Sequence, residues 1–171
     1  MSFIGTPSKG KTYAPGFFLA HEECERKTRE IPQSMATTEG NGTKYVKMGS
    51  AYPSNDGNAV GLVYEDVDVT TGNMPGSVVL KGVVYENRLP ITSVSYDAVT
   101  PETGDNPAEE GWYERSGSSP DYVYTLTTDT TVDSEKTYYA KTVTRLASAA
   151  KSALAALGFT FKTEPTVTRP Y

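Results

Sequence analysis

The stretch richest in side chains that could do chemistry is VYEDVDVTTGN, in which Asp66 and Asp68 lie two positions apart. Carboxylates at this spacing, with Gly72 close behind, are typical of calcium loops. An EF-hand loop starting at Asp66 requires glycine at its sixth position and glutamate at its twelfth, where the chain has Thr71 and Ser77. The spacing therefore argues against this kind of metal site.

Paired carboxylates also cleave glycosidic bonds, but the two groups must then face one cleft. Asp66 and Asp68 instead alternate with valines along one segment, so we expect them on the exposed face of a strand. A partial metal site with another ligand set stays open as an alternative. We predict no metal and no cofactor.

The lone histidine and the lone cysteine, His21 and Cys24, are three residues apart. A cysteine nucleophile also needs an orienting group and an oxyanion site. The segment follows Pro15 and Gly16 and precedes a charged run, which is typical of an exposed segment. The sequence also has no GxSxG, phosphate-loop, GxGxxG or HExxH motif. We therefore predict that the protein is not an enzyme.

Composition excludes several other functions. The 171 residues carry a net charge of −5 without a dense basic cluster, which argues against nucleic-acid binding. No apolar run approaches the roughly 20 residues of a membrane span. The N-terminus lacks the apolar core of a signal peptide, so we expect synthesis in a cytoplasm.

Residues 1–43 are interrupted by glycine and proline, and we interpret them as an extended arm. Within the arm, Pro15, Phe17, Phe18 and Leu19 form an apolar cluster. We predict that this cluster anchors the arm on a neighbouring protein. The alternative is that it packs on the chain's own core.

From residue 44 the pattern becomes β. Two segments rich in β-branched residues, 60–69 and 77–86, predict strands, and Gly82 marks a bulge or a close backbone approach. Valines and acidic residues alternate along the first segment, so its valines should face the core.

Residues 92–143 form a separate module rich in tyrosine and threonine. We predict its strands near residues 93–99, 111–115, 122–127 and 137–143. The aromatic side chains should make cross-strand pairs that hold a small sheet together. The alternative is an outward recognition surface formed by Trp112, Tyr113, Tyr122 and Tyr124.

The one clear helix covers residues 144–158, with Thr144 as its N-cap and Gly158 closing it. One face of this helix is apolar and should serve core packing or trimer contact; it presents Leu146, Ala150, Leu154 and Leu157. A final short strand, FTFKT, follows the helix.

The phrases AVGLVYEDVDVT, GNMPGSVV and LKGVVYENRLP, followed later by ASAAKSALAALGFTF, resemble the head decoration proteins of tailed bacteriophages, the family of the lambda head decoration protein. The resemblance covers residues 44–91 and 144–162, and the module separates these two stretches. It implies a mainly β, β-tulip or barrel-like decoration core, formed by residues 44–91 and 144–171, with one C-terminal helix.

The resemblance also implies a function. Such a protein binds the outer surface of the major capsid protein lattice as a homotrimer and stabilises the head of the virion, and its N-terminal arm adds a strand to a capsid-protein sheet. The alternative is an accessory protein of a head fibre or tail that binds a glycan or host surface through residues 95–143.

Overall fold

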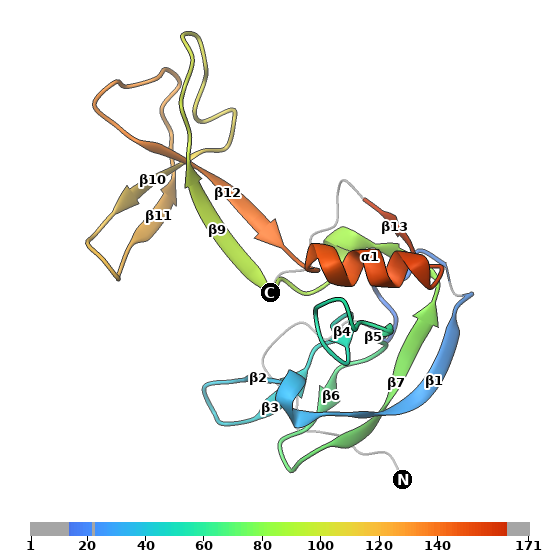
Figure 1. Cartoon of the computed structure of the whole chain (residues 1–171). Helices are drawn as coiled ribbons and strands as arrows, with labels where there is room; N and C mark the ends of the chain where they lie inside the picture. The colour runs from blue at the N-terminus through green and yellow to red at the C-terminus, as the bar shows by residue number, and fades with distance from the viewer. Residues whose placement is uncertain (1–13, 22, 164–171) are drawn as a thin grey trace. The chain divides into compact units, whose positions relative to one another are not determined.

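The computed structural model describes residues 14–21 and 23–163 (Figure 1). This part of the chain has thirteen strands in four sheets and one α-helix. The fold is therefore mainly β with one helix near the C-terminus, as predicted. Within the same residues, the sheets do not close into a barrel, and no helix is long and apolar enough to cross a membrane.

The chain divides into two compact units (Figure 1). The core unit joins the residues up to Pro90 to those from Arg145 onward, and the module is residues 91–144. The two stretches that carry the family resemblance therefore fold together, although the module separates them in the sequence.

The principal sheet of the core unit is antiparallel, with the strand order β1-β7-β5-β4. Its strands are β1 (Glu25–Ile31), β4 (Ala51–Tyr52), β5 (Gly61–Val63) and β7 (Met74–Lys81). Consecutive valines of β7 point to opposite faces, so Val78 enters one buried cluster and Val79 another. Buried apolar clusters thus lie on both faces of the sheet at β7, whereas the edge strand β1 is mostly exposed.

Two smaller sheets complete the core unit. One contains β2 (Thr37–Thr38), β3 (Lys44–Val46) and β6 (Val67–Asp68). The other pairs β8 (Val83–Tyr85) in parallel with β13 (Thr160–Lys162). Two short 3₁₀ helices are η1 (Gln33–Met35) and η2 (Glu86–Arg88).

The segment 60–69 forms two short strands instead of one. Between β5 and β6, the Asp66 carboxylate accepts a hydrogen bond from the Met48 amide at 2.6 Å. The predicted alternation nevertheless holds, because Val63 and Val67 are buried and Asp66 is exposed. Gly82 lies between β7 and β8, where a Cβ atom would be 3.3 Å from the Cβ of Cys24.

The helix α1 (Ser148–Ala156) is shorter than predicted, because Thr144 is the last residue of the module's β12 and Ala147 is the N-cap. Gly158 closes the helix with a φ of +97°. The Gly158 amide donates to Ala155 and the Phe159 amide donates to Leu154, which is a Schellman motif. This turn directs the chain into β13.

The prediction of an arm without regular structure through residue 43 is wrong. Residues 25–31 form the edge strand β1, which pairs along β7. Leu19 bridges to Val84, and Phe18 is fully buried in the core. Backbone hydrogen bonds join this segment to β8, since the Ala20 amide donates to the Val83 carbonyl and the Tyr85 amide donates to the Phe18 carbonyl. The part of the arm before residue 14, like the tail after residue 163, lies outside the described residues.

The module is one antiparallel sheet with the strand order β11-β10-β12-β9. Its strands are β9 (Ser93–Ala98), β10 (Tyr113–Ser116), β11 (Val123–Leu126) and β12 (Tyr138–Thr144). Only two residue pairs join β10 to β12. The sheet therefore consists of two ribbons, β10–β11 and β9–β12, which diverge from that crossing (Figure 1).

Candidate functional site

The acidic stretch shows no arrangement for binding a metal. Asp68 accepts a hydrogen bond from the Thr70 amide at 2.9 Å. Hydrogen bonds from the Thr70 side chain and amide hold the pKa of Asp68 below its usual value. In the described part of the chain, no three histidine, cysteine or acidic side chains are grouped so that they could hold a metal ion. Asp66 and Asp68 serve instead to order backbone turns.

His21 and Cys24 lie in different surroundings. His21 lines an open groove, whereas Cys24 is partly buried against the core cluster. The structure thus gives the Cys24 residue a packing position beside the core.

The groove beside His21, called the arginine groove below, has a volume of about 460 Å³. Its lining residues come from three distant parts of the sequence: Pro15, Gly16, Phe17, Leu19, Ala20, His21, Arg26, Tyr64 and Arg88. Three of the predicted anchors, Pro15, Phe17 and Leu19, thus share this groove. The fourth, Phe18, is fully buried, so its prediction as a surface anchor is wrong.

Cations and aromatic rings alternate in the arginine groove. The Arg26 guanidinium lies 4.2 Å from the centre of the Tyr64 ring. The Arg88 guanidinium lies 4.5 Å from the centre of the Phe17 ring and donates a hydrogen bond of 2.8 Å to the Phe17 carbonyl. Among the lining residues that the structure describes, Arg26 and Arg88 are the arginines, and no carboxylate occurs among these described residues. The exposed Arg26 guanidinium gives the groove a positive charge that could attract an acidic partner.

Three of the four apolar helix-face residues pack in the core. Leu146, Ala150 and Leu154 are buried in the cluster that also contains Phe18. Leu157 is different, because 48% of its surface is exposed. Of the four residues predicted for core or trimer packing, Leu157 is thus the one on the surface.

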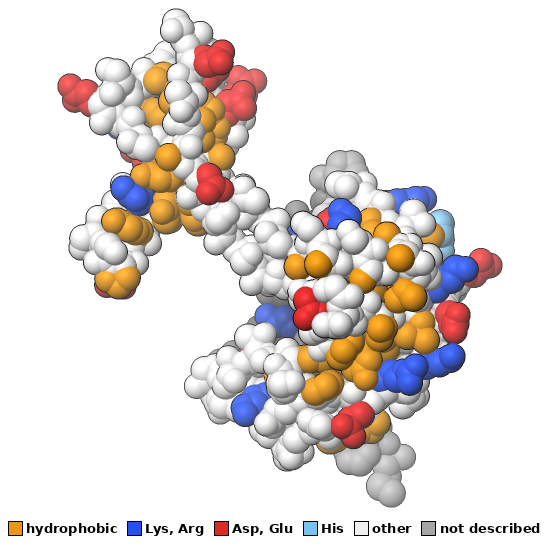
Figure 2. All heavy atoms as spheres, viewed as in Figure 1, with side chains coloured by type: hydrophobic (Ala, Val, Ile, Leu, Met, Phe, Trp, Pro, Cys, Tyr) orange, Lys and Arg blue, Asp and Glu red, His pale blue; other side chains and the backbone are white. Residues whose placement is uncertain are grey.

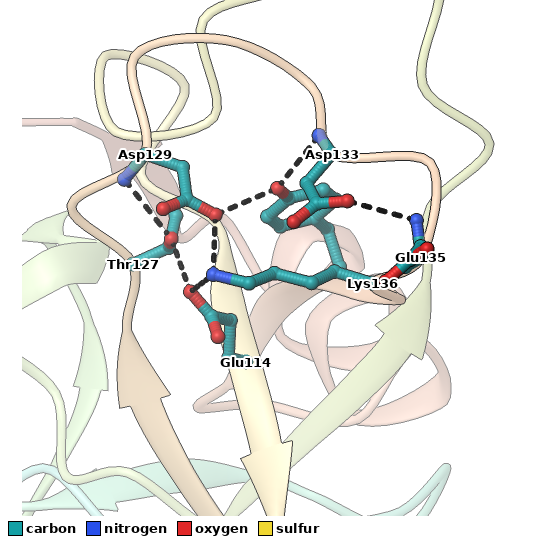
Figure 3. A network of polar contacts seen from close by, with 7 residues as sticks. Glu114, Thr127, Asp129, Asp133, Glu135 and Lys136 are labelled. Carbon is teal, nitrogen blue, oxygen red and sulfur yellow. Dashed lines mark hydrogen bonds and ion pairs between the residues drawn. The ribbon is translucent and has the colours of Figure 1, made fainter.

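A polar network holds one face of the module (Figure 3). Lys136 bridges Asp129 at 2.8 Å and Glu114 at 3.3 Å, and the Tyr138 hydroxyl donates to Asp129 at 2.8 Å. The buried Thr127 hydroxyl donates to Glu114 at 2.6 Å. These bonds tie the loop before β12 to β10, so they have a structural role.

The same network shifts the ionisation of its members. Hydrogen bonds from Lys136 and then Tyr138 hold the pKa of Asp129 below its usual value. The hydrogen bond to Asp129 in turn raises the pKa of Lys136. Burial raises the pKa of the Tyr138 hydroxyl.

The four aromatic residues of the predicted recognition surface do not share one face. Trp112 packs on Tyr138 with ring centres 5.8 Å apart, beside the polar network. Tyr113 and Tyr124 lie on the opposite face with Tyr122, which is 39% exposed. Including Trp112 in that surface is therefore wrong, because neighbouring strand residues alternate between faces.

Several residues that build these sites were not singled out from the sequence. Arg26 and Arg88 lie 62 positions apart in the numbering and meet only after β1 and η2 have packed. Tyr96 stacks on Tyr124 across the module, with ring centres 3.9 Å apart. The sequence offered one signal for Tyr96, because it lies in a segment predicted to form a strand of the module.

Comparison with family models, with curated proteins and with solved structures found no match in any of the three.

Proposed function

We propose that the chain is a capsid decoration protein of a tailed bacteriophage. It binds the outer surface of the major capsid protein lattice as a homotrimer and stabilises the head. In this role it needs no catalytic group and no cofactor.

The observation that supports the proposal is that the two stretches resembling the family fold together into one compact unit. Residues 44–91 and the segment from Arg145 onward form one unit, in which Leu154 packs with Leu62 and β13 pairs with β8. The module leaves and re-enters this unit through paired strands, since the Thr92 amide donates to the Thr144 carbonyl at 2.9 Å. An insertion of this kind preserves the core that carries the resemblance.

The proposed capsid contact is the arginine groove. It combines the Phe17 side chain of the predicted anchor cluster with the exposed Arg26, so it matches an acidic segment of the capsid protein. A trimer presents three copies of the groove, and weak single contacts then act together at a high effective concentration.

Charge reversal at Arg26 tests this contact. Arg26 and Arg29 are both exposed on β1, but only Arg26 lines the groove. We expect Arg26→Glu to weaken binding to empty, expanded heads about tenfold or more, because a repulsive charge replaces an attractive one. Cosedimentation of the purified protein with heads measures this affinity.

Arg29→Glu is the matched control and should bind heads like the unmodified chain. Equal binding by both variants would show that the groove does not contact the capsid. Failure of the unmodified protein to bind heads would reject the decoration role itself.

A further inference from the structure

One face of the module gathers tyrosines and aliphatic side chains. The strand register places the following residues on this aromatic face: Val94, Tyr96 and Ala98 of β9, Tyr113 and Arg115 of β10, Tyr124 and Leu126 of β11, and Tyr139, Lys141 and Val143 of β12. Tyr122, directly before β11, joins them through its contact with Arg115. Figure 2 shows hydrophobic side chains gathered over the module's strands.

The centre of the aromatic face is filled by its own rings. Tyr96 and Tyr124 stack with an interplanar angle of 4°, and Tyr113 meets Tyr96 edge-on at 5.2 Å. The periphery is open, because Tyr122 and Leu126 are 39% and 53% exposed. The centre therefore stabilises the sheet, and the periphery leaves ring and aliphatic surface in contact with solvent.

Charge is segregated between the two faces of the module. Residues 91–144 contain ten acidic side chains and three basic ones. Lys136 belongs to the polar network. The strand register places the other two cations, Arg115 and Lys141, on the aromatic face. The acidic residues of the four strands, Asp97 and Glu114, point to the other face.

Both cations of the aromatic face are held over rings instead of carboxylates. The Arg115 guanidinium lies 4.3 Å from the Tyr122 ring centre, and the Lys141 ammonium lies 5.7 Å from that of Tyr113. Within the module, which the structure describes completely, neither cation forms an ion pair. Each retains donors for an incoming anion.

We propose that the aromatic face binds an acidic oligosaccharide, of the uronate or sialate type. The C–H face of a sugar ring packs on Tyr122, because the face of an aromatic ring carries negative potential. The sugar carboxylate then accepts hydrogen bonds from Arg115 or Lys141. Hydrogen bonds between such charged groups are stronger than those between neutral groups.

The charges and the geometry distinguish this ligand from two others. Pairing the aromatic faces of two copies would bring like cations together at the interface, which is unfavourable. A polypeptide that binds a sheet through its backbone adds to an edge strand, whereas these cations project from the flat face. The module's excess of negative charge would repel a nucleic acid. The aromatic face offers two cations to neutralise phosphates, which is few for nucleic-acid binding.

Binding of the full-length protein to a glycan array that presents each acidic oligosaccharide beside its neutral counterpart tests the proposal. We expect binding to acidic members and on the order of tenfold weaker binding to their neutral counterparts. Arg115→Gln and Lys141→Gln should each weaken acidic binding several-fold. Tyr122→Ala should weaken it as well, and Tyr122→Phe should retain it.

Lys162→Gln, at an exposed position of the core unit, is the control for a general charge effect. The fluorescence of Trp112, the only tryptophan, reports whether each variant keeps a folded module. The proposal is overturned by absence of binding, by equal binding of neutral glycans, or by tighter binding of a hexaglutamate peptide. Binding that Arg115→Gln and Lys141→Gln leave unchanged overturns it too.

This inference does not depend on the proposed capsid role. The glycan array contains no capsid protein, and the head-binding test changes only residues of the core unit. Failure of one proposal therefore leaves the other intact.

Discussion

Single ionisable residues stabilise the module through the network around Asp129. This carboxylate accepts hydrogen bonds from the Lys136 ammonium and the Tyr138 hydroxyl. Both donors favour its charged form, and the folded-state pKa of Asp129 is lowered accordingly. The module should therefore depend on the ionisation of this residue.

A pH dependence of stability follows. The stabilisation from Asp129 is fully present above the ordinary aspartate pKa of about 3.9 and is lost as the pH falls through the lower folded-state value. We expect Asp129→Asn to reduce the module's stability at pH 7 and to flatten its decline in acid. Urea unfolding followed by Trp112 fluorescence measures both effects.

Asp121→Asn is the comparison, because Asp121 is exposed and outside the network. This variant should follow the pH profile of the unmodified chain. If Asp129→Asn also follows that profile, the network does not stabilise the module.

At the scale of single elements, α1 contributes to folding mainly through one side chain per turn. Leu154 is fully buried, whereas Leu157 is 48% exposed at the end of the same helix. The Schellman turn after the helix brings Phe159 into the cluster that contains Leu154.

We expect Leu154→Ala to lower the free energy of unfolding of the core unit by about 2–5 kcal/mol, because it leaves a cavity. Leu157→Ala should cost less than about 1 kcal/mol. Urea titration followed by far-UV circular dichroism measures the difference. Similar losses in both variants would contradict the burial of Leu154.

The elements that could be predicted are those with a local signal. Tyrosine and threonine runs between turns located the four module strands, and the apolar spacing located the buried helix face at Ala150 and Leu154. Strand β1 was missed because its sequence, ERKTREI, is charged on both faces and has no alternation. Its structure depends on non-local pairing with β7.

The candidate sites were less predictable than the fold. Pro15, Phe17 and Leu19 were expected together, but Arg26 reaches them only through the position of β1. On the module, Tyr122 and Arg115 share a face because of the β10–β11 register, which depends on the geometry of the turn between the strands as well as on their residue pattern.

At the scale of the whole molecule, the module is an insertion with adjacent ends. Ser93 pairs with Thr144, so its first and last strands begin and end side by side. Excising residues 92–143 and joining the ends through Asn-Gly should leave a folded core unit. Its unfolding midpoint in urea should change little, and head binding should persist.

The same excision should abolish binding to acidic glycans. An excised chain that is unfolded by circular dichroism would show that the core unit depends on the module, and would contradict its description as a separate unit.

Cryo-electron microscopy of heads with and without the protein tests the proposed decoration of the capsid most directly. We predict added density at the three-fold and quasi-three-fold positions of the outer surface. Each added feature should contain three copies of the core unit. Heads that look identical with and without the protein, or density confined to tails, would contradict the claim.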